Sequence, residues 1–160
     1  MGWNVLHVKP RREKKVAEHC EQLKVEHYLP LRQETKVYQR RKVTVSKPVF
    51  PGYIFASFDD EGRVSLLKTN CLVRILPSPD ESALVHELDQ VRAALAVDPT
   101  LGATAAMRKG RTVRIVGGPF RGIEGRIDML KGQTMVCLNV EMIGQAIRVE
   151  VDRSLVELAD

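Results

Sequence analysis

The sequence contains no apolar run of about 18 residues, so it offers no candidate for a membrane-spanning helix. It also lacks the basic region and apolar core of a secretory signal, because Met1-Gly-Trp-Asn leads directly into a strand-like segment. These absences predict a soluble, cytoplasmic protein with no membrane partner. Its 160 residues and 44% hydrophobic content are typical of one ordinary globular domain or two small ones.

Cysteine and histidine are scarce, and their spacing does not suit a disulfide framework or a metal site. The three cysteines, Cys20, Cys71 and Cys137, form neither an even set nor the paired spacing of a zinc site, so we expect them to be buried as small apolar residues. The four histidines form no HxxxH pair, and no GxSxG or GxxxxGK[ST] motif occurs. The sequence therefore predicts no metal, no other cofactor and no catalytic residue.

Acidic residues are few in the first third of the chain. Residues 1–47 contain twelve lysines and arginines but only five glutamates, an excess larger than the formal net charge of +5 of the whole chain. A basic face of this kind attracts polyanions such as nucleic acids. A solvated face without a partner is the alternative, because most runs of charge have that role.

The first hundred residues alternate between strand-like and helix-like patterns. β-Branched residues on both sides of Arg40-Arg41-Lys42 predict a hairpin with these cations at its tip. Ser78 and Glu81 have the spacing of a capping box, and Pro79 suits the first position of a helix. The expected elements are strand 3–8, helix 10–24, the hairpin 35–45, strand 53–58, helix 63–68, strand 73–76 and a helix after Pro79 with its apolar stripe at Leu84, Leu88, Val91 and Leu95.

The last third of the chain has only strand-like patterns. Two alternating runs in residues 113–127 are joined by Gly117-Gly118-Pro119, which predicts a hairpin, and later turns are expected at Lys131-Gly132 and Ile143-Gly144. Residues 98–108 lack periodicity and predict a linker. The expected strands are 112–116, 123–129, 134–140, 146–151 and 155–158, the spacing of a small barrel.

This glycine-rich hairpin resembles the KOW motif of transcription factors and some ribosomal proteins. The residues that carry the resemblance are Gly110, Val113, Gly118, Pro119, Phe120, Gly122 and Gly125. Together with Trp3, Lys9 and Phe50-Pro-Gly-Tyr53, and with the order of the elements, they make the whole chain resemble the NusG family of transcription elongation factors. The resemblance implies an α+β protein: an N-terminal NGN α/β sandwich at 1–97, with an antiparallel sheet and helices, a linker at 98–108, and a C-terminal KOW SH3-like β-barrel at 109–160.

In that family the NGN domain binds the clamp helices of the largest RNA polymerase subunit, which implies a polymerase-binding role for part of this chain. The alternative from the residues alone is an ordinary core, because alternate residues of one strand face one way and one face of the sheet must be buried. Asn70-Cys71-Leu72-Val73 also departs from the proline-glycine-valine turn of the family. The implied polymerase-binding residues are Trp3, Phe50, Pro51, Tyr53, Phe55, Lys68, Thr69, Asn70, Ile75 and Leu76.

The resemblance implies contact with the non-template DNA strand of the transcription bubble as well, and recruitment of NusE or Rho by the KOW domain. The short NGN half looks more like specialised antiterminators of the RfaH and UpxY kind, although dense β-branched alternation predicts a constitutive barrel. We expect a monomer. A ribosome-associated, KOW-type RNA-binding protein is the alternative function. The implied nucleic-acid-binding residues are Lys9, Arg11, Arg12, Lys15, Arg40, Arg41 and Lys42.

Overall fold

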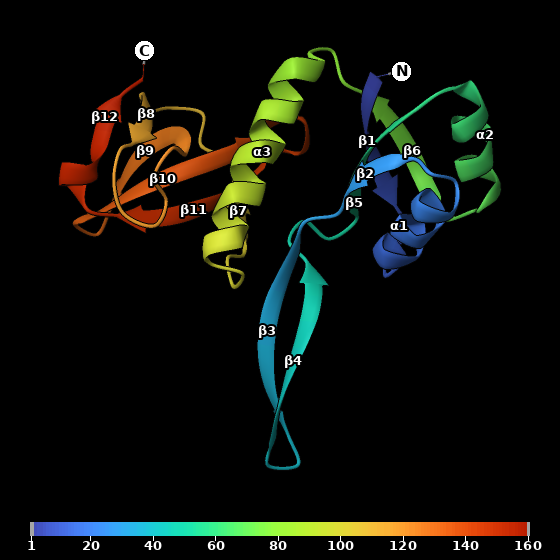
Figure 1. Cartoon of the computed structure of the whole chain (residues 1–160), viewed down its shortest axis with the longest axis horizontal. Helices are drawn as coiled ribbons and strands as arrows, with labels where there is room; N and C mark the ends of the chain where they lie inside the picture. The colour runs from blue at the N-terminus through green and yellow to red at the C-terminus, as the bar shows by residue number, and fades with distance from the viewer. Residues whose placement is uncertain (1, 160) are drawn as a thin grey trace. The chain divides into compact units, whose positions relative to one another are not determined.

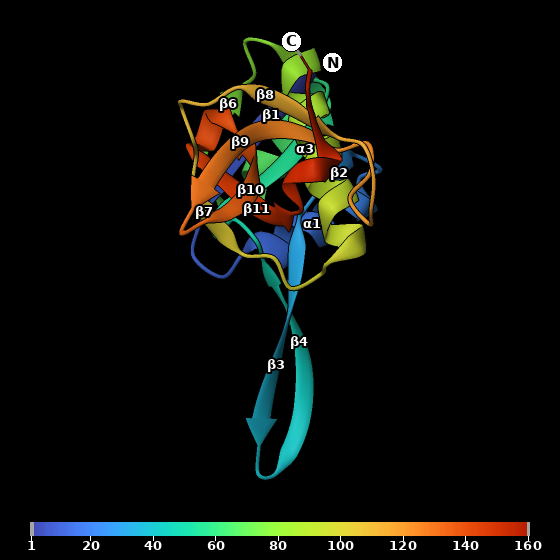
Figure 2. The same cartoon turned by 90° about the vertical axis from the view of Figure 1, so that its left-hand side faces the viewer.

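The computed structural model describes residues 2–159, which form two compact units (Figures 1 and 2). The first unit comprises the chain up to Pro30 together with Pro48–Val85, and the second comprises Leu31–Lys47 and the chain from His86 onward. The division falls inside the helix α3 (Glu81–Val97), whereas the sequence places a domain boundary after residue 97. In the part of the chain that the structure describes, no helix is both long and apolar enough to cross a membrane.

The first unit is built on a four-stranded sheet in the order β2-β5-β1-β6. Each neighbouring pair of strands is antiparallel, as the sequence analysis implied. Two helices accompany the sheet. The elements are β1 (Gly2–Val8), α1 (Glu13–Gln22), β2 (Glu26–Tyr28), β5 (Tyr53–Phe58), α2 (Asp60–Lys68) and β6 (Leu72–Pro77).

Both helices pack against one face of this sheet. Val16 and Cys20 of α1 and Leu66 of α2 share a core cluster with Leu6 and Ile54 of the strands, and all five are 0% exposed. The one-turn spacing of the two α1 residues places them on the same side of the helix. All three cysteines are buried and unpaired with one another, as predicted.

Two helix starts differ from the sequence predictions. Residue Arg11 has a φ of 63°, outside the helical region, so α1 begins at Glu13 and not at Pro10. The start of α3 is capped by Asp80, whose Oδ1 accepts a hydrogen bond from the backbone N–H of Ala83 at 3.1 Å. In a capping box the Glu81 carboxylate would accept a hydrogen bond from the backbone N–H of Ser78. That N–H donates to the Trp3 carbonyl instead, so the predicted capping box is wrong.

The hairpin consists of β3 (Leu31–Tyr38) and β4 (Arg41–Pro48), joined by the two-residue loop Gln39-Arg40. Both loop residues have positive φ, 47° and 68°, as a type I′ turn requires. Figure 2 shows the two strands as a long, twisted ribbon. The hairpin is confirmed, although only Arg40 of the predicted tip lies in the loop and the other two cations begin β4.

The rest of the second unit contains a six-stranded antiparallel sheet in the order β12-β8-β9-β10-β11-β7. Every strand and turn predicted after residue 109 is present within about one residue of its expected position. The expected linker 98–108 contains the short strand β7, which pairs with β11. The strands are β7 (Ala103–Ala105), β8 (Thr112–Ile115), β9 (Glu124–Leu130), β10 (Gln133–Val140), β11 (Gln145–Val151) and β12 (Val156–Leu158).

Candidate functional site

The face of the first sheet that points away from the core shared with α1 and α2 carries four of the ten predicted polymerase-binding residues, Trp3, Tyr53, Phe55 and Leu76. In the centre of the sheet, Val5 of β1 pairs with Phe55 of β5 on one side and with Leu76 of β6 on the other. Two residues further along β1, and so on the same face, His7 pairs with Tyr53. We call this surface the Tyr53 face.

The predicted residues divide between the two faces of the sheet. Leu76 shares the Tyr53 face, but Ile75 packs against the core cluster on the opposite face. The two cannot line one surface, because successive strand residues point to opposite sides. Phe50 and Phe55 are 1% and 0% exposed, so in this structure they are packed side chains and not contact surface.

The remaining candidates on this side of the sheet are accessible. Trp3 and Tyr53 are partly exposed and Pro51 is exposed. Fewer of the predicted polymerase-binding residues near Tyr53 are therefore accessible to a partner than the sequence implied.

The turn that leads into β5 is unusually well fixed. The backbone N–H of Tyr53 donates to the Phe50 carbonyl at 3.1 Å, and Gly52 has a φ of 89°. Proline at the second position and a left-handed glycine at the third are the signature of a type II turn. The Phe50-Pro-Gly-Tyr53 motif thus forms a type II turn, the turn that its proline and glycine favour.

Neighbouring elements hold this turn from both sides. The Gly52 carbonyl accepts a hydrogen bond from the backbone N–H of Val8 at 2.8 Å. The Gly52 N–H donates at 2.9 Å to a carboxylate oxygen of Glu13, which is only 6% exposed. The first turn of α1 and the end of β1 together fix the position from which Tyr53 projects.

His7 stacks on Tyr53, with ring centroids 5.2 Å apart and an angle of 20° between the ring planes. This contact restricts the tyrosine ring on the Tyr53 face. Sequence reasoning missed His7. Alternation along the first strand places it on the same face as Trp3, but its partner depends on the register with β5, which the sequence does not reveal.

The end of α2 brings together a predicted polymerase contact and a predicted DNA contact. Lys9 Nζ donates to Asn70 Oδ1 at 3.2 Å, and the Lys9 backbone N–H donates to the Cys71 carbonyl. Asn70 has a φ of 59°, a conformation that asparagine tolerates well, and Thr69 Oγ1 donates to the Leu66 carbonyl at 2.6 Å. Thr69 therefore helps to end the helix, while Lys68 and Asn70 are exposed.

The predicted nucleic-acid-binding residues fall in both units. Arg11, Arg12 and Lys15 are exposed around the start of α1, next to Lys9. Arg40, Arg41 and Lys42 are exposed in the hairpin of the second unit.

The glycines of the barrel motif are required for two different reasons. Gly110, Gly118 and Gly122 have φ values of 108°, 78° and 92°, which favour glycine. At Gly125 the reason is space, because an added Cβ would lie 2.5 Å from the carbonyl oxygen of Cys137. Of the other predicted motif residues, Val113 is buried, Phe120 is partly exposed and Pro119 is exposed.

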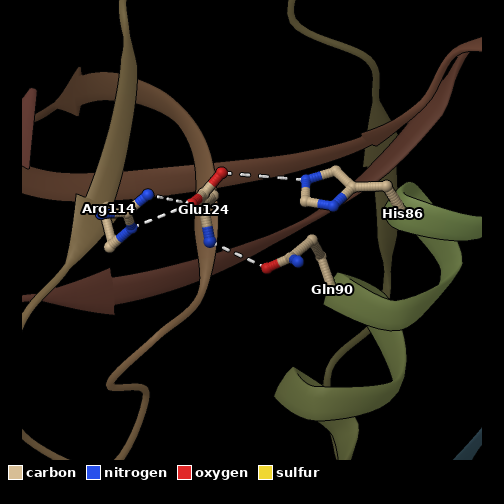
Figure 3. A network of polar contacts seen from close by, with 4 residues as sticks. All are labelled: His86, Gln90, Arg114 and Glu124. Atoms are coloured by element: carbon tan, nitrogen blue, oxygen red, sulfur yellow. Dashed lines mark hydrogen bonds and ion pairs between the residues drawn. The ribbon is translucent and has the colours of Figure 1, made fainter. Parts of the chain in front are cut away.

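A polar network joins the barrel to the part of α3 that belongs to the same unit (Figure 3). The Glu124 carboxylate accepts from Nε and Nη2 of Arg114 at 2.9 and 2.6 Å, and it lies 3.9 Å from His86 Nε2. The Glu124 backbone N–H donates to Gln90 Oε1 at 2.8 Å. Glu124, in the glycine-rich hairpin of the barrel, thus contacts three side chains.

A family model described as "Transcription termination factor nusG" matches residues 1–93. The chain belongs to the NusG family. This match covers the Phe50-Pro-Gly-Tyr53 turn, the Tyr53 face and the hairpin, and it makes the chain a NusG-family transcription factor.

A solved structure titled "Domain interaction in Thermotoga maritima NusG" has a similar fold. It superposes with a TM-score of 0.51 at 20% sequence identity, over 99% of this chain and 97% of that one. At this identity the likeness concerns the fold alone. The predicted combination of an N-terminal α/β sandwich and a C-terminal β-rich domain is confirmed.

Proposed function

We propose that this NusG-family factor binds the clamp helices of RNA polymerase through the Tyr53 face and promotes processive elongation and antitermination. The observation that supports the proposal best is the fixed turn at Phe50–Tyr53. Glu13 and Val8 hold its backbone, and His7 stacks on the ring that follows it. A partly exposed aromatic ring on a rigid turn binds a helix at a small cost in side-chain entropy.

The clamp helices would contact the accessible residues of the predicted set, namely Trp3, Pro51 and Tyr53, with Leu76 beside them. Phe50 and Phe55 support this surface from within, since both are buried in this structure. Lys68 and Asn70, exposed at the end of α2, would make the polar contacts to the opposing side of the polymerase cleft. Bridging that cleft favours the closed, elongating state if the factor binds it more tightly than the open state.

The non-template DNA strand is the proposed partner of the exposed cations near α1 and at the tip of the hairpin. Such contacts give salt-dependent attraction with little sequence preference. The KOW domain, proposed at residues 109–160 and joined through residues 98–108, would recruit NusE or Rho. We propose a monomeric factor, more similar to the specialised RfaH and UpxY paralogues than to housekeeping NusG.

A binding titration of the full chain against a polypeptide containing the clamp helices tests the polymerase contact. We expect Tyr53→Ala to weaken binding by at least tenfold, about 1.4 kcal/mol, because the variant removes the central aromatic anchor. Tyr38→Ala is the matched control, since Tyr38 is a 69% exposed tyrosine in the hairpin. Far-UV circular dichroism shows whether each variant keeps its fold.

Equal binding by the wild type and Tyr53→Ala would remove the Tyr53 face as the contact. The ribosomal alternative makes a different prediction in the same preparation. A ribosome-associated protein would bind structured RNA tightly without polymerase and would show no affinity for the clamp helices.

A further inference from the structure

The charge of the chain is concentrated in the β3–β4 hairpin. Residues 31–48 contain six lysines and arginines and a single acid, Glu34, so their excess of positive charge equals the formal net charge of +5 of the entire chain. The predicted tip, Arg40-Arg41-Lys42, accounts for only half of these cations. The others lie along the strands, where their positions depend on the register of the hairpin.

The type I′ loop defines that register, because a two-residue loop places Tyr38 opposite Arg41. Alternation along the two strands then separates two faces of the ribbon. The first, which we call the cationic face, carries Arg32, Lys36, Arg41 and Lys47 around Glu34, together with the neutral side chains of Tyr38, Val43 and Val45. The other face carries mainly neutral side chains, among them Gln33, Thr35, Thr44 and Ser46, with Lys42 near the loop.

Side-chain contacts agree with this register. Glu34 lies 2.9 Å from Lys47 Nζ and 3.7 Å from Arg32 Nη1. One carboxylate therefore serves cations from both strands. The hydrogen bond from Lys47 lowers the pKa of the Glu34 carboxyl, and the neighbouring Lys47 ammonium lowers the pKa of Lys36. The cationic face has more positive charge than its own acid can balance.

We propose that the cationic face of the β3–β4 hairpin binds the phosphate backbone of double-stranded B-form DNA, with the ribbon lying in the major groove. This extends the nucleic-acid part of the proposed function from the loop to the strands, and it does not depend on the polymerase contact. A B-DNA major groove about 12 Å wide accommodates a two-stranded β-ribbon. The new contact residues are Lys36 and Lys47, with Arg32 at the base of the ribbon. Arg41, which the resemblance already implied, lies on the same face.

The strands of the hairpin, unlike the tip that is proposed to meet the non-template strand, are poorly suited to other nucleic acids. Proteins that hold single strands use several aromatic side chains on which successive bases stack, and this ribbon has one, Tyr38. The major groove of an A-form RNA duplex is too deep and narrow for side chains to read. Duplex DNA is therefore the partner that matches both the shape and the charge of the ribbon.

Fluorescence anisotropy of a labelled DNA duplex, titrated with the full chain in the absence of polymerase, tests the proposal. We expect Lys36→Gln combined with Lys47→Gln to weaken binding roughly tenfold near 0.1 M salt and to reduce the slope of log affinity against log salt by about 1.8. Arg121→Gln combined with Lys131→Gln is the matched control. It removes the same charge from exposed turns of the barrel and should change the affinity less than threefold.

A second variant shows whether changes in DNA affinity come from the charge of the hairpin itself or from a damaged fold. Glu34→Gln removes the single acid of the hairpin and should tighten binding to duplex DNA. Equal weakening by the two double variants, no tightening by Glu34→Gln, or equal affinity for an A-form RNA duplex would each overturn the proposal. The assay contains no clamp helices, so such a failure would leave the role proposed for Tyr53 in place.

Discussion

Glu13 accepts a hydrogen bond from the backbone N–H of Gly52 at 2.9 Å, although the two residues are 39 positions apart in the sequence. This bond connects the first turn of α1 to the turn that precedes β5. It gives a buried carboxylate a partner and satisfies a backbone donor that the strands do not use. The turn proposed to present Tyr53 thus depends on Glu13, a buried residue that is not among the proposed polymerase-binding residues.

Glu13→Ala should destabilise the protein by about 1.5–3 kcal/mol, the usual contribution of a hydrogen bond to a charged group. Urea denaturation measures this loss. Glu18→Ala is the control, because Glu18 lies on the same helix but is exposed. Comparable losses in the two variants would show that the Gly52 contact contributes nothing particular.

Asp80→Ala should cost about 1 kcal/mol of stability, because it removes the side-chain acceptor for the backbone N–H of Ala83 in the first turn of α3. Ser78→Ala should be close to neutral, since Ser78 donates to the Trp3 carbonyl through its backbone N–H, which alanine keeps. Thermal unfolding of the two variants side by side distinguishes them. A larger loss in Ser78→Ala would restore the capping box that the sequence indicated.

The sequence predicted an element correctly where several independent signals agreed. The barrel strands could be predicted because alternation, β-branched residues and glycine turns all indicate the same structure. The start of α3 could not, because Ser78 and Asp80 are both good capping residues and a tertiary contact with Trp3 decides between them. Strand β7 was missed because Ala-Thr-Ala has little β propensity and pairs only where β11 offers an edge.

The candidate site was predicted less completely than the fold. Ile75 and Leu76 point to opposite faces, a consequence of strand alternation that the resemblance obscured. The burial of Phe55 and the stacking of His7 on Tyr53 depend on tertiary packing and register. The pattern of residues along one strand reveals neither the tertiary packing nor the register.

Gly125→Ala should be far more damaging than Gly122→Ala. A Cβ at Gly125 would lie 2.5 Å from the Cys137 carbonyl oxygen, so β9 and β10 would have to separate. At Gly122 the space is open and only the φ of 92° is unfavourable, which costs about 1–2 kcal/mol. Chemical shifts and thermal unfolding of the two variants test this order. Equal losses would mean that the strands adjust easily at Gly125.

The buried thiol of Cys20 should make the stability of the protein depend on pH in the alkaline range. Burial raises the pKa of this thiol from its usual value of 9.0 to about 11. The unfolded chain therefore loses the thiol proton at a lower pH than the folded chain does. The resulting contribution to stability is complete below pH 9 and declines as the pH rises from 9 towards 11.

Urea midpoints of the wild type and Cys20→Ala, measured at half-unit steps from pH 8 to pH 11, isolate this effect. We expect the difference in unfolding free energy between the two proteins to be constant up to about pH 8.5 and then to shrink, by at most about 1.4 kcal/mol per pH unit. Deprotonation of lysines and of Cys137 affects both proteins and cancels. A difference that stays constant up to pH 11 would mean that the Cys20 thiol ionises as readily in the folded protein as in the unfolded chain.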